Sequence, residues 1–113
     1  MNLREYKNKA VLLRDTSVYR VYDLGVLNRL NLSLTELKPH QETGGHSHKS
    51  TDEVYIFSGS GIIKNGSKQE KVKDGDVVLV PRGNFHKVYN KSNSLLRFWT
   101  VFVKYKGREG SKS

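Results

Sequence analysis

The chain has 113 residues, the size of one small domain, so a second catalytic domain is not expected. It contains no cysteine, which excludes disulfides, thiolate catalysis and cysteine-ligated zinc or iron–sulfur sites. No apolar run reaches the roughly 18 residues of a transmembrane helix, so no membrane partner is expected. A formal net charge of +9 favours an anionic metabolite, anionic lipid or nucleic acid as partner.

The chain opens with a charged segment, residues 1–10, that lacks the apolar core of a secretory signal, so a cytoplasmic location is expected. Within it, Leu3 to Lys9 predicts a short helix. Residues 29–37 alternate leucine with polar side chains, the period of a half-buried strand. Further β-rich runs occupy residues 18–24, 54–57, 61–64, 77–80 and 95–103.

Turn signals separate these runs. Asn65-Gly66 predicts a type I′ hairpin, and Asp74-Gly75-Asp76 predicts a turn into the strand at 77–80. Many short strands divided by turns indicate an all-β sandwich or barrel. The hairpin lysines, at 64, 68, 71 and 73, lack interleaved aromatic residues, so they are read as a solvent face and nucleic acid is not expected as a partner.

Three of the four histidines form a pattern that suits a metal. On an extended chain, His46 and His48 point to one side. Glu53 follows after a short turn and shares a strand face with Tyr55 and Phe57. His86 comes later, on a face shared with Val88 and Asn90. Three imidazoles and one carboxylate suit a divalent transition metal and leave positions open for water or substrate.

These residues carry a resemblance to the cupin family. Residues 75–90 match its second motif, Gly-x5-Pro-x-Gly-x2-His-x3-Asn, at Gly75, Pro81, Gly83, His86 and Asn90. The first motif is matched at its ligand core, His46, His48 and Glu53. His40 and Ser60 stand where that motif has turn glycines.

The resemblance implies an all-β double-stranded β-helix, a jelly-roll barrel. We assign its core to residues 29–103, preceded by an N-terminal strand or arm at 1–28 and followed by a basic flexible tail at 104–113. It also implies that His46, His48, Glu53 and His86 bind manganese, iron, nickel, cobalt or zinc. Pro81 and Gly83 shape the turn before His86, and Asn90 is structural or supports the ligands.

Other side chains are candidates for the chemistry beside the metal. Tyr55 has a hydroxyl for substrate or a metal-bound water, although core packing is its default role. Arg97 and Trp99 share one strand face; if it is interior, Arg97 binds a carboxylate or phosphate there, and otherwise it faces solvent or an interface. Either Phe98 or Trp99 lines the barrel. His40 is read as a solvated loop residue, with a substrate contact as the alternative.

The expected function is a metal-dependent reaction on a small anionic or sugar-like molecule. Within the family that the chain resembles, a sugar or sugar-phosphate isomerase or epimerase is placed first, because the chain is basic. A dioxygenase, a lyase or decarboxylase, and a non-catalytic module that binds a metal or small ligand are the alternatives. The small size and aromatic last strand also predict a homodimer.

Overall fold

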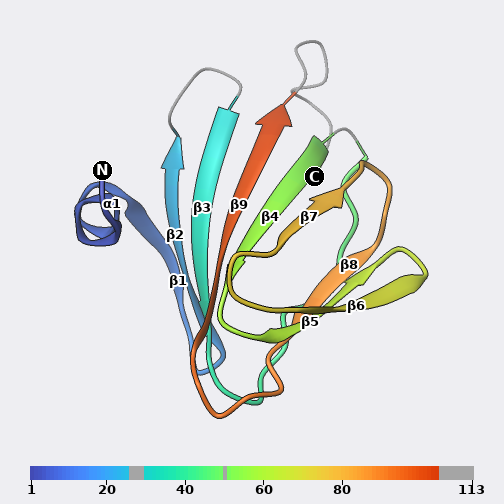
Figure 1. The fold of residues 1–113 in the computed structure, drawn as a ribbon. Coiled ribbons are helices and arrows are strands. Elements are labelled where there is room, and N and C mark those ends of the chain that lie inside the picture. Colours follow the sequence, from blue (N-terminus) through green and yellow to red (C-terminus); the bar gives the residue numbers. More distant parts are fainter. Residues whose placement is uncertain (26–29, 50, 105–113) are drawn as a thin grey trace.

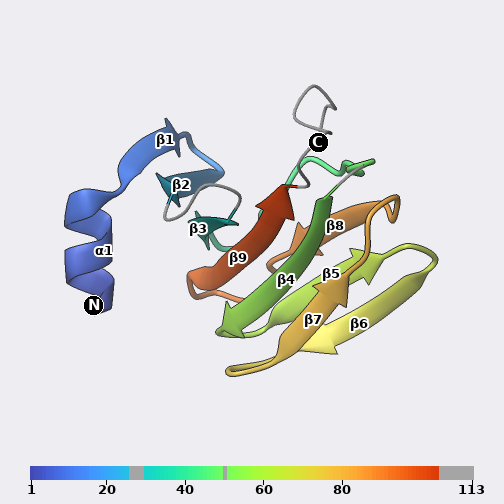
Figure 2. The same cartoon turned by 90° about the horizontal axis from the view of Figure 1, so that it is seen from above.

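Two antiparallel sheets face each other (Figures 1 and 2). The computed structural model describes residues 1–25, 30–49 and 51–104. The larger sheet has the strand order β1 (Val11–Asp15), β2 (Tyr19–Gly25), β3 (Leu30–Leu37), β9 (Leu96–Lys104), β4 (Thr51–Ser58), β7 (Val77–Val80). The smaller sheet has the order β6 (Lys68–Val72), β5 (Gly61–Asn65), β8 (His86–Tyr89). This arrangement confirms the predicted all-β, double-stranded β-helix fold.

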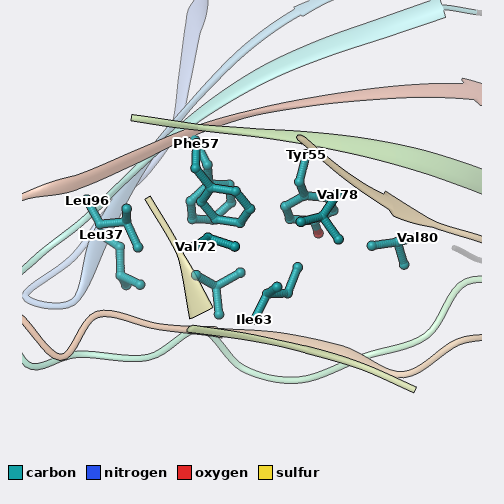
Figure 3. Close-up of a cluster of buried hydrophobic side chains, with 10 residues drawn as sticks. Leu37, Tyr55, Phe57, Ile63, Val72, Val78, Val80 and Leu96 are labelled. Atoms are coloured by element: carbon teal, nitrogen blue, oxygen red, sulfur yellow. The ribbon is translucent and has the colours of Figure 1, made fainter. Parts of the chain in front are cut away.

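Strand alternation decides which side chains meet between the sheets. Along β4, Thr51, Glu53, Tyr55 and Phe57 are buried, while the residues between them are more exposed. An apolar cluster fills the region beyond the polar end of this strand (Figure 3). Its members are Leu37, Tyr55, Phe57, Ile63, Val72, Val78, Val80, Val88, Leu96 and Phe98.

The short helix α1 (Leu3–Lys9) covers the outer face of the larger sheet. Asn2 and Glu5 form a capping box that starts it. Tyr6 anchors it: the residue is 1% exposed, and its hydroxyl donates a hydrogen bond to the Leu32 carbonyl at 2.7 Å. The Tyr6 ring packs edge-on against Trp99, with centroids 4.8 Å apart. Among the described residues, no helix is long and apolar enough to span a bilayer.

The predicted elements are present, with two differences. The first is β1, which alternation did not reveal because all five of its residues are exposed. The second is the hairpin, whose two-residue loop is Gly66-Ser67, between the paired residues Asn65 and Lys68. Only Gly66 has a positive φ, 63°, so the turn has the type II′ pattern and not the predicted type I′.

The predicted boundaries between arm, barrel and tail fall at or beyond the ends of the described ranges. The boundary between arm and barrel, at residues 28 and 29, lies outside the described residues, as do residues 105–113 of the predicted tail. What the structure adds is that β1 and β2 continue the larger sheet, because β2 pairs with β3 along its whole length.

The motif residues outside the ligand set shape the backbone. Gly75 and Gly83 have φ values of 88° and 86°, which favour glycine. His40, at the family's glycine position, keeps the left-handed conformation with a φ of 60°. Asn90 is 1% exposed, and its side-chain amide lies within 3.2 Å of three carbonyl oxygens, those of Leu37, Lys38 and Ser94. It therefore joins the end of β8 to the loops around it.

Candidate metal centre

A cavity of about 610 Å³ opens between the two sheets and holds the predicted ligand set. His46, His48, Glu53 and His86 all line it, and so does Tyr55. Much of the remaining wall consists of hydroxyl side chains and apolar side chains: Ser33, Thr35, Thr43, Thr51, Thr100, Val21, Val88, Phe98 and Phe102.

Backbone pairing brings the histidines together from distant parts of the sequence. The segment before β4 forms an antiparallel bridge with β8, in which His46 and His86 exchange N–H···O bonds of 3.2 and 2.9 Å. His48 follows two residues later, and its carbonyl accepts a bond from the Gly83 N–H at 2.7 Å. Ring centroids of the three imidazoles consequently lie 4.5 to 5.1 Å apart.

Hydrogen bonds orient two of these imidazoles. His46 Nδ1 lies 3.2 Å from the Gly44 carbonyl oxygen, and His86 Nδ1 lies 3.0 Å from that of Asn84. A carbonyl only accepts, so each Nδ1 carries the proton and each Nε2 offers a lone pair. One nitrogen from each histidine lies within 4.8 Å of the others. Two imidazoles on one ion have donors at most about 4.2 Å apart, so binding requires only a small contraction.

Glu53 supplies the charge that three neutral imidazoles lack. Its Oε2 lies 3.0 Å from His48 Nε2 and 3.4 Å from His86 Nε2. Glu53 Oε2 and His86 Nε2 are buried and have no hydrogen-bond partner among the described residues. Buried polar atoms without partners are costly, and a cation between them would satisfy both. The donor set therefore fits a divalent transition metal.

Burial shifts the titration of these groups. It raises the pKa of Glu53 from 4.5 to about 7, an effect that a hydrogen bond with Tyr55 partly offsets. Burial lowers the pKa of His86, which keeps this imidazole neutral and ready to bind a metal. Burial and the nearby Glu53 charge raise the pKa of Tyr55 well above 10, so its hydroxyl keeps its proton at neutral pH.

Three predicted substrate contacts lie away from the cavity. Arg97 and Trp99 do share a face, but it is the outer one: Arg97 Nε bonds to Glu36 Oε2 at 2.8 Å, and Trp99 packs against α1. Of the neighbouring aromatic residues Phe98 and Trp99, Phe98 is the one that lines the interior. His40 is exposed, and its Nε2 lies 2.6 Å from Asn93 Oδ1.

Glu36 explains why Arg97 faces outward. Its carboxylate is 2% exposed and also bonds to Lys7 at 2.9 Å. Burial alone would raise the pKa of Glu36, but hydrogen bonds from Arg97 and Lys7 outweigh it and lower the value. The cation therefore has a structural partner on the outer face.

Arg14 lines the cavity and was not predicted as a site residue. It belongs to β1, the strand that alternation did not reveal. A basic residue in a short run, VLLRD, gives no signal by residue type or spacing. Only the pairing of β1 with β2 shows which way this residue faces.

Known proteins agree with this fold. The family model of the cupin domain matches residues 33–103, and the chain belongs to that family. An oxalate-binding protein of Thermotoga maritima is 32% identical over 69 residues, 60% of this chain. The match spans 57% of that relative's length.

Solved structures share the fold at low identity. A protein of Thermus thermophilus superposes with a TM-score of 0.78 at 21% identity, over 92% of this chain and 95% of its own. A cupin-superfamily sugar phosphate isomerase of Silicibacter pomeroyi gives a TM-score of 0.69 at 21% identity, over 77% of this chain and 60% of its own. Such identities establish a shared architecture, and one architecture hosts many chemistries.

Proposed function

We propose that this cupin binds one divalent transition metal through His46, His48, Glu53 and His86 and acts on a small anionic or sugar-like molecule. The reaction proposed first is of the isomerase or epimerase type. The observation that carries the proposal is the convergence of Glu53 Oε2 and His86 Nε2, buried 3.4 Å apart without hydrogen bonds, beside two further imidazoles in an open cavity.

The bound ion would supply Lewis acidity, polarising a carbonyl or hydroxyl oxygen of the substrate. The chain's own residues do the rest. His46 and His86 hold their Nδ1 protons against backbone carbonyls, which aims Nε2 at the centre. Tyr55 keeps its proton and, through its hydrogen bond with Glu53, positions that carboxylate.

The cavity wall supports a hydroxylated ligand. Ser33, Thr35 and Thr100 line it from adjacent strands β3 and β9, paired as Ser33 with Thr100 and Thr35 with Phe98. Hydroxyl groups donate and accept, as sugar hydroxyls do. The neighbouring Phe98 offers an apolar face.

Non-catalytic binding of a small carboxylate is the second candidate. The 32% identity to an oxalate-binding protein favours it. Dioxygenase and lyase chemistry would use the same four ligands and are the remaining alternatives.

Metal content tests the centre. Elemental mass spectrometry of protein reconstituted with Mn²⁺ or Zn²⁺ is expected to give about one equivalent for wild type, and under about a tenth for His86→Ala and His48→Ala. His40→Ala is the matched control, since His40 lies outside the cavity, and it should retain the full equivalent. A wild-type chain without metal, or an equal loss in His40→Ala, would overturn the centre.

Deuterium exchange tests the reaction class. An isomerase that moves a proton next to a carbonyl incorporates solvent deuterium, so the metal-loaded protein is incubated with aldose and ketose phosphates in D₂O and followed by NMR. Exchange in wild type and none in His86→Ala is the expected result. Stoichiometric oxalate binding without exchange would favour the non-catalytic candidate.

We also propose that the chain forms a homodimer through β1. This edge strand presents three consecutive apolar side chains, Val11, Leu12 and Leu13, at 63, 47 and 58% exposure. An unpaired apolar edge strand favours pairing with another strand, and a second copy supplies one.

Light scattering at micromolar concentration is expected to give a dimer for wild type and a monomer for Leu13→Lys. Leu79→Lys, an exposed position on the opposite edge strand β7, is the control that should remain dimeric. A monomeric wild type, or dissociation only in Leu79→Lys, would refute an interface on β1.

A further inference from the structure

The side chain of Arg14 reaches the cavity because β1 contains a β-bulge. Val11 and Leu12 pair with Asp23 and Tyr22, but the register then shifts, and Arg14 pairs with Val21. Leu13 is the extra residue. Bulges re-aim side chains and are common beside functional sites.

Without the bulge, Arg14 would stand opposite Arg20. Arg20 belongs to the outer face, where it pairs with Asp15 at 3.1 Å and approaches Glu36 at 3.9 Å. Val21 instead lines the cavity. One inserted residue therefore moves a guanidinium from the outer, carboxylate-bearing face to the inner, ligand-accessible one.

No carboxylate among the described residues forms an ion pair with Arg14. Arg20, Arg82 and Arg97 each form an ion pair with a carboxylate. No carboxylate oxygen of residues 1–25, 30–49 and 51–104 is within 4.0 Å of an Arg14 nitrogen. Asp23, two residues after Val21 on β2, is held by Asn31 and by the Ser33 hydroxyl.

Arg14 is also the one lysine or arginine among the described residues that line the cavity, and Glu53 is the one acid. They stand on different walls. Arg14 comes from the β1–β2–β3 end of the larger sheet, on the side of α1, whereas two of the histidines come from the segment before β4 and the third from β8 (Figure 2). A ligand that reaches both is bifunctional: one end has an oxygen for the metal centre, and the other end is an anion.

We infer that Arg14 is the anion-binding and specificity-determining residue of this cavity, and that it selects ligands with a carboxylate or phosphate group. The inference rests on the proposed function and names its substrate class. A planar guanidinium offers paired N–H donors that match the two oxygens of either group, which a lysine would not reproduce.

Calorimetric titration of the Mn²⁺-reconstituted chain tests this. The probes are oxalate, glucose 6-phosphate and uncharged glucose. Arg14→Gln is expected to weaken binding of the anion that wild type prefers by about tenfold or more, with its metal content and its affinity for glucose unchanged. Arg14→Lys should recover only part of the loss. If Arg14→Gln loses more affinity for oxalate, Arg14 binds a carboxylate; if it loses more for glucose 6-phosphate, Arg14 binds a phosphate.

Arg4→Gln is the matched control: it removes an exposed arginine of α1, outside the cavity lining, and should bind both anions as wild type does. Equal anion affinity in wild type and Arg14→Gln would overturn the inference, and so would a wild type that holds metal but binds neither anion. If no metal is retained but anion binding still depends on Arg14, the metal centre fails and the inference stands.

Discussion

Replacing Glu53 with glutamine is expected to raise the free energy of unfolding of the metal-free protein by about 3 kcal/mol at pH 8. The pKa of this carboxyl is about 7 in the folded chain because burial penalises its charge, against an ordinary value of 4.5. Between those two values the folded chain binds more protons than the unfolded one. Stability therefore falls as pH rises from 4.5 to 7. Above pH 7, the full cost of burying the ionised Glu53 carboxylate applies.

Urea denaturation in a chelator at pH 5 and pH 8 measures this effect. Glu53→Gln keeps the shape of the side chain but not its charge, so its advantage over wild type should grow from about 1 kcal/mol at pH 5 to about 3 kcal/mol at pH 8. Comparing the two chains at each pH cancels the titration of the histidines. Glu70→Gln, an exposed carboxylate of β6, is the control and should change stability by under about 0.5 kcal/mol.

The same substitution should weaken metal binding by at least about tenfold, because it removes the proposed anionic ligand. A stabilised chain that binds metal poorly is the signature of a carboxylate retained for binding at the expense of folding. An unchanged unfolding free energy at pH 8 would show that the Glu53 charge is not costly in the metal-free fold.

Phe57→Ala is expected to destabilise the chain by about 3 to 5 kcal/mol, the range for deleting a buried aromatic ring. Phe57 is 2% exposed, with its ring centroid 5.5 Å from Phe98 and 6.2 Å from Tyr55 (Figure 3). Small domains have total stabilities of about 5 to 15 kcal/mol, so this variant approaches the limit of folding.

Thermal and urea unfolding compare it with Leu79→Ala, a truncation on β7 where the side chain is 67% exposed, which should cost under about 0.5 kcal/mol. Phe57→Leu should recover part of the loss, since it refills part of the cavity. Equal costs for Phe57→Ala and Leu79→Ala would contradict the assignment of Phe57 to the core.

Local pattern predicted much of the inward-facing set. Glu53, Tyr55 and Phe57 were placed on one face because strand side chains alternate with a period of two, and the structure buries all three. The three histidines of the proposed metal centre followed from spacing and from the family motifs. The turn glycines Gly75 and Gly83 were found in the same way.

What the sequence could not predict depends on long-range pairing. Alternation puts Arg97 and Trp99 on one face but does not say which, and the outer position follows from packing against Tyr6 and Glu36, about sixty or more residues away in the chain. The orientation of Arg14 depends on a bulge. After Leu12, the residues of β1 face the opposite side from the one that simple alternation would give. A shift of one residue changes the face of every side chain that follows it.

The proposed ligands come from both layers of the fold: Glu53 from β4 of the larger sheet, and His86 from β8 of the smaller. An ion held by both would act as a cross-link between the layers, much as a disulfide links two segments. Without the ion, the two sheets would separate first at the cavity, where this cross-link is lost. Chelation should therefore give faster amide exchange in β8 and the segment paired with it than in the β2–β3 ladder.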